Sequence, residues 1–388
     1  MNPTPGSCLR RFWPLLMAAA LGAQTAQVLE TKTITPPEEP YAGWSTLARR
    51  ANGELWVTWS GGRDGHVCPM GQVRAMTSKD DGATWTYPRV LLDSPTDDRD
   101  SGVMETAKGT LLVTTFTSLA YEADLAKSLM YLPDGKGPAM RPMKPEVIAR
   151  WQAAQNRLTA EQRKAELGEW VLRSTDGGLN FSARIATIVN SPHGPLQLKD
   201  GRLLYVGKQL WKPDGKIGAA ESKDDGLTWT WLSEIPTRPG DDVKKGYHEL
   251  FAIETDDGRI VTQIRNHNKP DAGTTLQCES SDGGRTWTVP KSIDVWGLPS
   301  QLLKLKDGRL LMTYGHRRKP FGNQARLSTD HGRTWSAPMI VSGDGTTGDL
   351  GYPATVELAD GTLLTVWYEN MKDLGKAVLR QAKWKIGK

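Results

Sequence analysis

Short runs of apolar residues alternate along the chain with turns built from Asp-Gly or a similar pair. Six such turns are each followed by an apolar run, and their glycines are Gly53, Gly109, Gly201, Gly258, Gly308 and Gly361. An Asp-Gly pair between two apolar runs is the strongest short-range signal for a β-hairpin. The pattern therefore predicts six hairpins and an all-β chain.

A second pattern, the eight-residue frame S-x-D-x-G-x-T-W, follows five of these hairpins. It occurs, with small variations, at residues 78–85, 174–181, 222–229, 280–287 and 328–335. The frame suits a tight turn, because its Asp bonds nearby backbone, its Gly takes positive φ and its aromatic residue packs into a core. Each such frame, called a box below, is expected to close the outer hairpin of a four-stranded unit.

The sixth unit lacks a box, but other segments can complete it. Ala377–Trp384 can supply its third strand, and Gln27–Ile34 can supply its outer strand and close the ring. Six four-stranded sheets arranged radially form a six-bladed β-propeller. Because a single blade cannot bury its faces alone, the repeat predicts one unit over residues 27–388.

The spacing of the repeat indicates one insertion. From Gly109 to Ser174 is 65 residues, whereas the matching interval from Gly201 to Ser222 is 21. The second blade therefore carries an insertion at about residues 119–168. Within it, Pro145–Leu167 is expected to be helical and Tyr121–Pro145 to be a loop. The insertion is either a surface decoration or a lid over one face.

The N-terminal segment indicates export. Arg10-Arg11 precede an apolar run over Phe12–Leu21 and then small and polar residues, which is the pattern of a signal peptide over residues 1–26. We therefore expect a secreted or periplasmic protein. No later segment is long and apolar enough to span a bilayer.

Composition narrows the partners further. Cys68 and Cys278 allow one disulfide, although nothing in the sequence pairs them, and no Cys or His cluster has zinc spacing. No metal or cofactor is predicted. The net charge of +5 is too small to indicate nucleic acid and is compatible with an acidic small ligand.

The repeat also locates the functional site. Each glycine turn joins an inner strand to a second strand, so the other ends of these strands meet near the axis, away from the boxes. We call that end of the axis the mouth. The residues nine positions before each turn glycine are Trp44, Asp100, Pro192, Glu249, Pro299 and Tyr352. Ionisable groups beside them and at the ends of the second strands are Arg63, Asp64, His66, Arg99, His193, Lys208, His248, Arg265, His267, Arg317 and Arg318. Such a concentration predicts a binding or catalytic site at the mouth and a structural role for the boxes.

With its boxes identified as Asp-boxes, the chain resembles the sialidase superfamily over its whole mature length. The resemblance implies that Tyr352 is the nucleophile, and that Glu249, 16 residues before Arg265, is its general base. It implies that Asp64 is the acid/base, with Asp100 in reserve. It also implies that Arg265 and either Arg317 or Arg318 hold the substrate carboxylate. A neutral Tyr suits an acidic sugar, whose carboxylate would repel a carboxylate nucleophile.

The chain departs from the family at the start of the first blade. Where sialidases have Arg-Ile-Pro, it has Tyr41-Ala-Gly-Trp44, so Arg63 or Arg99 would have to complete the arginine clamp. We therefore expect an exo-glycosidase that acts on a terminal acidic sugar of a glycan, and poor turnover of ordinary sialosides. The mouth histidines, which are His66, His193, His248 and His267, also fit a lyase acting on uronate-containing glycans. A third alternative is a glycan-binding propeller without catalysis.

Overall fold

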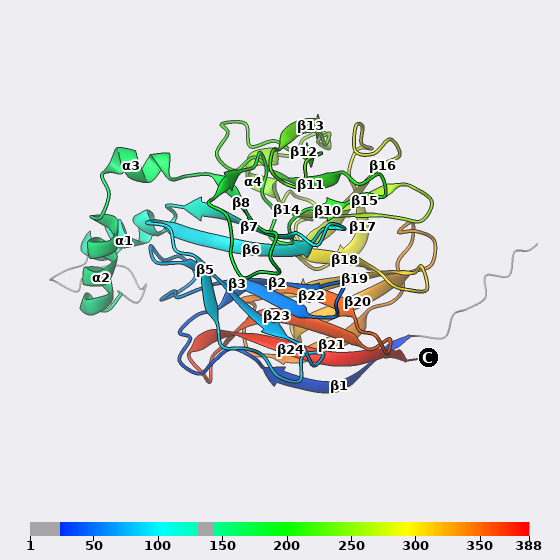
Figure 1. The fold of residues 1–388 in the computed structure, drawn as a ribbon, viewed down its shortest axis with the longest axis horizontal. Coiled ribbons are helices and arrows are strands. Elements are labelled where there is room, and N and C mark those ends of the chain that lie inside the picture. The colour runs from blue at the N-terminus through cyan, green and yellow to red at the C-terminus, as the bar shows by residue number, and fades with distance from the viewer. Residues whose placement is uncertain (1–23, 131–142, 388) are drawn as a thin grey trace, which may run out of the picture.

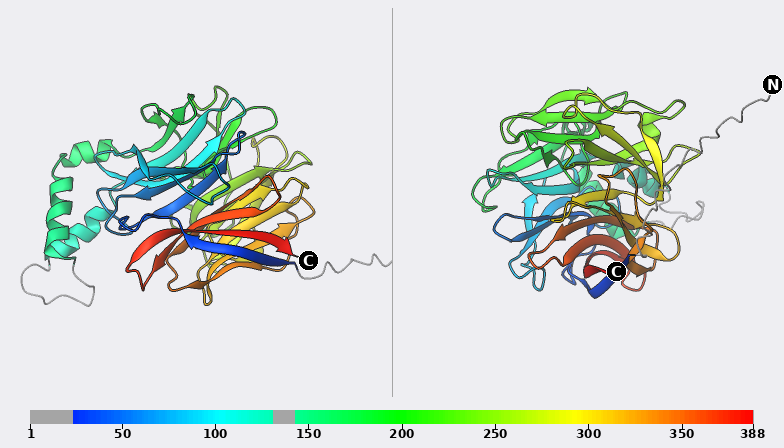
Figure 2. Two further views of the ribbon diagram at one scale, coloured as in Figure 1. Left: turned by 60° about the horizontal axis from the view of Figure 1, so that its bottom comes forward. Right: turned by 90° about the vertical axis from the view of Figure 1, so that its right-hand side faces the viewer.

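Six four-stranded antiparallel sheets surround one axis in the computed structural model, which describes residues 24–130 and 143–387 (Figures 1 and 2). The expected six-bladed β-propeller is confirmed. The first three blades contain, in order, β2 (Gly43–Arg49), β3 (Leu55–Gly61), β4 (Gln72–Ser78), β5 (Arg89–Leu92); β6 (Asp97–Glu105), β7 (Leu111–Ser118), β8 (Glu169–Ser174), β9 (Ile185–Ala186); and β10 (Leu196–Gln197), β11 (Leu203–Lys208), β12 (Ile217–Ser222), β13 (Thr230–Glu234).

The remaining blades continue the pattern. They contain β14 (Tyr247–Glu254), β15 (Ile260–Asn266), β16 (Thr274–Ser280), β17 (Lys291–Trp296); β18 (Ser300–Lys304), β19 (Leu310–His316), β20 (Phe321–Ser328), β21 (Met339–Gly345); and β22 (Leu350–Glu357), β23 (Leu363–Met371), β24 (Lys376–Gly387), β1 (Thr25–Thr33). In the last blade β1 pairs with β24, as the sequence predicted, so the chain's first strand closes the ring (Figure 1).

The boxes lie at the end of the propeller opposite the mouth. Ser78, which opens the first box, pairs with Leu55, which follows the glycine turn, so both turns share one end of the blade. Inside this box Asp80 accepts hydrogen bonds from Ser78 Oγ (2.7 Å), Thr84 N (2.9 Å) and Thr84 Oγ1 (2.6 Å). The carboxylate therefore serves the turn rather than a ligand.

Box tryptophans link neighbouring blades. Trp85 Nε1 of the first blade donates to Gln381 Oε1 of the sixth at 2.8 Å. Trp335 Nε1 of the fifth blade donates to Gln277 Oε1 of the fourth at 3.2 Å. Trp229 of the third blade packs in a core cluster with Leu112 and Val171 of the second. These contacts close the interfaces between blades and hold the inner strands in register around the axis.

The insertion in the second blade is more helical than the sequence predicted. It contains α1 (Tyr121–Met130), α2 (Pro145–Gln155) and α3 (Ala160–Ala165), which project from one side of the propeller (Figures 1 and 2). The loop expected over Tyr121–Pro145 is thus wrong in its first part, because Tyr121 and Leu125 lie one turn apart and pack against Trp151 of α2. The predicted helix over Pro145–Leu167 is split in two, with Thr159 forming a capping box at the start of α3.

The predicted signal peptide falls mostly on residues 1–23, outside the described residues. Within residues 24–130 and 143–387, no helix has the length and apolar character needed to cross a membrane. Cys68 and Cys278 are both buried and free. They lie in different blades, Cys68 in the loop after β3 and Cys278 in β16, so no disulfide joins them.

Candidate active site

The candidate residues on the inner strands sit at a repeated β-bulge. The pairing register shifts near the start of β2, β6, β14 and β22. In three of these bulges a residue other than glycine has positive φ: Trp44 (54°), Asp100 (46°) and Tyr352 (54°). This backbone conformation costs on the order of 1–3 kcal/mol of stability per residue, and residues that adopt it are concentrated at functional sites. A bulge also re-aims a side chain, which in these four blades is the residue nine positions before the turn glycine.

Tyr352, Glu249 and Arg265 meet at the mouth. Tyr352 Oη donates a hydrogen bond to Glu249 Oε1. Arg265 Nη1 donates to the same carboxylate oxygen at 2.9 Å and lies 3.2 Å from Tyr352 Oη. The three residues come from β22, β14 and β15, in two blades. A phenol, a carboxylate and a guanidinium therefore share one contact point on the axis.

The charges in this group favour a neutral Tyr352 beside an ionised Glu249. Burial alone would raise the pKa of Glu249, but the Arg265 guanidinium, followed by His248 and the Tyr352 hydroxyl, lowers it to about 2. Burial and then the Glu249 charge raise the pKa of Tyr352 well above its usual range. Glu249 is thus placed and charged to accept the phenolic proton, and Tyr352 loses that proton only when another bond forms at its oxygen.

Of the two candidate arginines in the fifth blade, Arg317 faces Tyr352. Its Cζ lies 5.9 Å from the centre of the Tyr352 ring, and its buried Nε and Nη2 have no hydrogen-bond partner in the described residues. Arg318 is exposed, and its Cζ stacks 3.8 Å from the centre of the Trp296 ring. Arg318 is therefore directed away from Tyr352, which corrects the open choice between the two.

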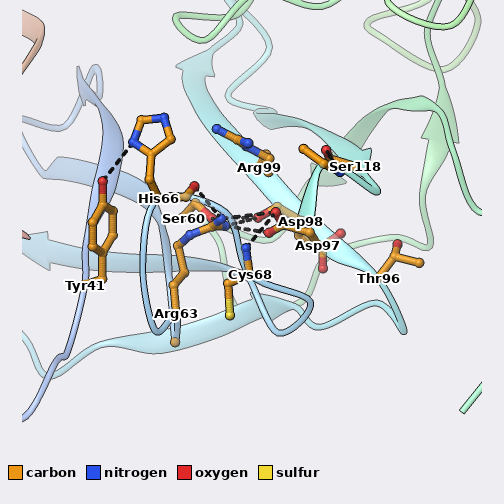
Figure 3. Close-up of polar contacts among 12 residues, drawn as sticks. Tyr41, Ser60, Arg63, His66, Cys68, Thr96, Asp97, Asp98, Arg99 and Ser118 are labelled. Atoms are coloured by element: carbon orange, nitrogen blue, oxygen red, sulfur yellow. Dashed lines mark hydrogen bonds and ion pairs between the residues drawn. The ribbon is translucent and has the colours of Figure 1, made fainter. Parts of the chain in front are cut away.

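Arg63 is not available to a ligand, which corrects the expectation that it might complete an arginine clamp. It is fully buried and pairs in bidentate fashion with Asp97, at 2.6 and 3.1 Å (Figure 3). Its other donors bind Ser60 Oγ (2.8 Å), the Gly65 carbonyl (3.2 Å) and the His66 carbonyl (3.0 Å). Every N–H of the guanidinium is used, so this group fixes the loop after β3.

Arg99 is the arginine that remains open at this part of the mouth. Its Cζ lies 4.5 Å from the centre of the Trp44 ring and 6.0 Å from that of Phe116. Its Nε is buried without a partner among the described residues, and no carboxylate there forms an ion pair with it. Trp44, which occupies the first bulge, thus holds the Arg99 guanidinium by stacking.

Asp64 is hydrogen-bonded to the insertion. Its Oδ1 accepts from Arg150 Nη2 at 2.6 Å and its Oδ2 accepts from Trp151 Nε1 at 2.9 Å. Both partners belong to α2, which no pattern in the sequence connected to the first blade. None of the hydrogen bonds of the described residues joins Asp64 to Tyr352 or Glu249.

Asp100 lies beside Glu249 in the wall of a cavity of about 160 Å³. The other lining residues are Phe116, Asn190, Ser191, Pro192, Lys208, Leu210 and His248. Burial raises the pKa of Asp100 to about 7, against the lowering effect of Arg99. Its carboxyl group therefore exchanges a proton near neutral pH. Lys208 has no free N–H donor, because its Nζ donates to three backbone carbonyls, at 2.6 to 3.2 Å.

Three of the predicted histidines surround the same centre. His267 Nε2 accepts from Arg265 Nε at 2.8 Å, and the His248 ring meets the His267 ring edge-on at 4.9 Å. Burial and then the Arg265 charge lower the pKa of His267 to about 4, and burial lowers that of His193 to about 4. The His267 and His193 rings are therefore neutral at ordinary pH; His267 orients Arg265, and the His193 ring lies 6.5 Å from that of Tyr352.

The fourth histidine, His66, belongs to a cluster that the sequence did not reveal. Its Nδ1 lies 3.1 Å from Tyr41 Oη and 3.6 Å from Asp349 Oδ1. Asp349 also accepts from Tyr368 Oη at 2.8 Å, and the Tyr368 ring lies 5.7 Å from that of Tyr352. Asp349 stands only three positions before Tyr352, but its partners Tyr41 and His66 come from the first blade, so a search along the chain could not connect them.

The described residues contain no group of three or more His, Cys, Asp or Glu side chains placed to hold a metal ion. The mouth offers acids, bases and arginines. Together they can hold an anion beside a buried phenol that is hydrogen-bonded to a carboxylate.

Comparison with known proteins agrees with the propeller fold. Residues 162–365 match the family described as BNR repeat-like domain. A sialidase from Micromonospora viridifaciens is 26% identical over 137 residues, which cover 32% of this chain and only 20% of that protein, so the chain spans about a fifth of this curated relative.

Two solved structures share the fold over most of the chain. A protein of unknown function from Dyadobacter fermentans DSM 18053 is 24% identical, covers 93% of this chain and 99% of its own, and superposes with a TM-score of 0.72. A Hadza microbial sialidase is 18% identical, covers 88% of this chain and 65% of its own, and has a TM-score of 0.61. At this identity both show the fold alone.

Proposed function

This chain belongs to the family of BNR repeat-like domains, in the superfamily of sialidase and BNR-repeat propellers, and from that premise we propose that it is an exo-acting glycoside hydrolase. It would remove a terminal acidic sugar from a glycan with retention of configuration. The observation that carries the proposal is the contact of a neutral, buried Tyr352 with an ionised Glu249 at the mouth.

The reaction would use these two groups in sequence. As Tyr352 Oη bonds to the anomeric carbon, its proton passes to Glu249, and the bond to the leaving glycan oxygen breaks as a second acid/base group at the mouth protonates that oxygen. Water then attacks the anomeric carbon and gives its proton to that same group, while the departing Tyr352 oxygen takes its own proton back from Glu249. A neutral phenol avoids the repulsion that a carboxylate nucleophile would meet from a substrate carboxylate.

The open arginines support an acidic substrate. Arg317 and Arg99 have buried nitrogens without partners in the described residues, and Arg265 lies between the Tyr352 hydroxyl and Glu249. A carboxylate satisfies unpaired guanidinium donors through charge-assisted, often bidentate, hydrogen bonds. Trp44 stands where the resemblance to sialidases places an arginine, so the clamp is held differently, and we propose a preference for an acidic sugar other than common sialosides.

The neutral imidazoles beside Arg265 favour a second candidate, a lyase. A lyase would use His267 or Tyr352 as the base that removes the proton next to a uronate carboxylate, which Arg265 would neutralise. Its product is an unsaturated sugar that absorbs in the near ultraviolet, whereas a hydrolase releases a reducing sugar. A non-catalytic glycan-binding propeller would yield neither product.

The test is a panel of aryl glycosides of N-acetylneuraminic acid and of glucuronic acid, together with uronate-containing glycans. We expect a reducing sugar, and we expect Glu249→Gln to lower kcat by about 10²–10⁴. Tyr352→Phe should abolish turnover. Tyr87→Phe is the matched control, because Tyr87 also bonds to a glutamate, Glu38, but is exposed outside the mouth.

Each other outcome counts against the hydrolase. An unsaturated product would establish the lyase, and binding without any product would establish the lectin-like alternative. Full activity of Tyr352→Phe would remove Tyr352 as the nucleophile. The predicted export also stays a proposal: protein recovered outside the cytoplasm should lack residues 1–26 by mass.

A further inference from the structure

The loop between β3 and β4 holds two groups able to transfer a proton, and they face different partners. Asp64 is committed to α2, since each of its carboxylate oxygens accepts a hydrogen bond, from Arg150 at 2.6 Å and from Trp151 at 2.9 Å. Moving it to a glycosidic oxygen would break both bonds and leave the Trp151 indole, in a buried residue, without its acceptor.

His66, two residues later, is open on its outer side. Its side chain is 54% exposed, and the hydrogen bonds of the described residues engage only its Nδ1. The ring meets Trp44 edge-on at 4.9 Å, and Trp44 in turn stacks with Arg99. In Figure 3 the His66 ring and the Arg99 guanidinium lie on the same side of the buried Arg63–Asp97 pair. Nε2 therefore faces the part of the mouth where Arg99 is open.

The carboxylate of Asp349 and the phenol of Tyr41 hold the inner ring nitrogen of His66, Nδ1. Asp349 Oδ1 lies 3.6 Å from His66 Nδ1, and Tyr41 Oη lies 3.1 Å from Nδ1 and 3.3 Å from Asp349 Oδ2. Asp349 is itself fixed by Tyr368 Oη at 2.8 Å and Asn370 Nδ2 at 3.1 Å. An imidazole oriented by a carboxylate at one nitrogen can gain or lose a proton at the other, which is the arrangement that general acid–base catalysis requires.

The same cluster reaches the proposed nucleophile. Tyr368, which donates to Asp349, has its ring 5.7 Å from the ring of Tyr352. His66 thus stands on the first-blade side of the mouth, and Glu249 on the fourth-blade side of Tyr352. A sugar bound over Tyr352 would have separate proton carriers for its leaving oxygen and for its nucleophile.

We propose that His66 is the acid/base residue of the hydrolase, in place of Asp64, and this inference rests on the proposed function. Protonated His66 gives its Nε2 proton to the glycosidic oxygen as the bond to the anomeric carbon breaks and Tyr352 Oη bonds to that carbon. In the second half, neutral His66 takes a proton from the attacking water through Nε2, and the Tyr352–carbon bond breaks. Asp349 and Tyr41 are positioning residues that keep Nδ1 turned inward.

The charged and titratable groups around the imidazole come from several elements. They are Asp349 before β22, Tyr41 before β2, Tyr368 on β23, Arg63 in its own loop and Arg99 on β6. The pH dependence assigned to His66 must therefore be separated from Asp100, whose pKa burial raises to about 7. Comparison of His66→Gln with Asp100→Asn makes that separation.

The experiment compares a good and a poor leaving group on one sugar. We use the 4-nitrophenyl and methyl glycosides of N-acetylneuraminic acid and of glucuronic acid. Because an activated leaving group departs without protonation, His66→Gln should lose about 10²–10⁴ in kcat/KM on the methyl glycoside and far less on the 4-nitrophenyl glycoside. The limb of the pH–rate profile set by the acid should disappear, and azide should restore turnover by forming a glycosyl azide.

Matched variants keep the inference falsifiable. His316→Gln replaces a histidine at the end of β19 whose ring meets Trp296 edge-on at 5.7 Å, and should leave both rates unchanged. Asp349→Asn keeps the imidazole and should move the pH profile. Equal losses on both leaving groups, or the leaving-group effect in Asp100→Asn instead, would overturn the assignment to His66. If the wild-type protein hydrolyses neither sugar, the proposed function is refuted as well. If the wild type is active, Tyr352→Phe is inactive and His66→Gln keeps the wild-type rates, only the assignment of His66 is refuted.

Discussion

The substitution Arg63→Met tests whether the buried pair at the mouth is structural. Arg63 and Asp97 are both fully buried, and the guanidinium donates to two carboxylate oxygens, one hydroxyl and two backbone carbonyls. Methionine has a similar length but supplies none of these donors. The variant therefore leaves Asp97 charged in a site without its partner.

The cost follows from the burial of the carboxylate that remains. Breaking a fully buried ion pair from one side costs about 3–5 kcal/mol, because the other charge stays uncompensated. The hydrogen bond from Cys68 N to Asp97, at 3.5 Å, is too long to replace it. In Arg63→Met/Asp97→Leu both charges are gone, so most of the loss should be recovered, since an apolar pair of similar volume is often as stable.

Urea unfolding followed by tryptophan fluorescence measures this difference through the midpoint at constant slope. We expect the midpoint to fall in Arg63→Met and to return most of the way in the double variant. Folded Arg63→Met protein, assayed below its transition, should keep the wild-type KM for the acidic sugar. An unchanged midpoint with a tenfold rise in KM would refute the structural role of Arg63 and indicate that Arg63 binds the substrate carboxylate.

Two further predictions concern the box and the buried acid. Trp229→Ala should lower the free energy of unfolding by about 3–5 kcal/mol, because Trp229 fills the core between the second and third blades; lost activity at an unchanged urea midpoint would contradict a structural role. For Asp100 the folded pKa of about 7 exceeds the ordinary 3.8, so its contribution to stability is complete below 3.8 and is lost as the pH rises through 7. The free energy of unfolding of Asp100→Asn relative to wild type should therefore rise by up to about 4 kcal/mol across that interval, and a constant difference in urea titrations would show that Asp100 is not held neutral.

The fold was predictable because each repeat carries its own local signal. An Asp-Gly turn and a box need only neighbouring residues, and counting six of one and five of the other is enough to fix the number of blades. The same count put Trp44, Asp100 and Tyr352 at one position, and all three occupy the positive-φ residue of a bulge. The register of a position within each repeat depends only on neighbouring residues, so it can be predicted without knowing the contacts between blades.

The helices of the insertion could be predicted only in part. Pro145 and the residues after it form a helix, as expected, but α1 was missed because its apolar face is narrow, with Tyr121 and Leu125 as its buried residues. What the insertion does to the site was not predictable at all. Arg150 and Trp151 bind Asp64 across 86 and 87 residues of sequence, and no pattern in either segment predicts this contact.

The arginines show why the rest of the site needed the structure. In sequence Arg63 and Arg99 are equivalent candidates, since each lies at the mouth end of a strand. Their difference arises from burial: Asp97 lies within reach of Arg63 and uses it fully, whereas Arg99 stacks on Trp44 and keeps an unpaired nitrogen. A buried cation that is already paired adds nothing to the binding of an anion. A buried cation with unpaired donors favours an anion beside it, because the anion supplies the missing acceptors. Trp44, where the resemblance to sialidases places an arginine, is the aromatic surface on which Arg99 stacks, and the Arg99 Nε has no partner among the described residues.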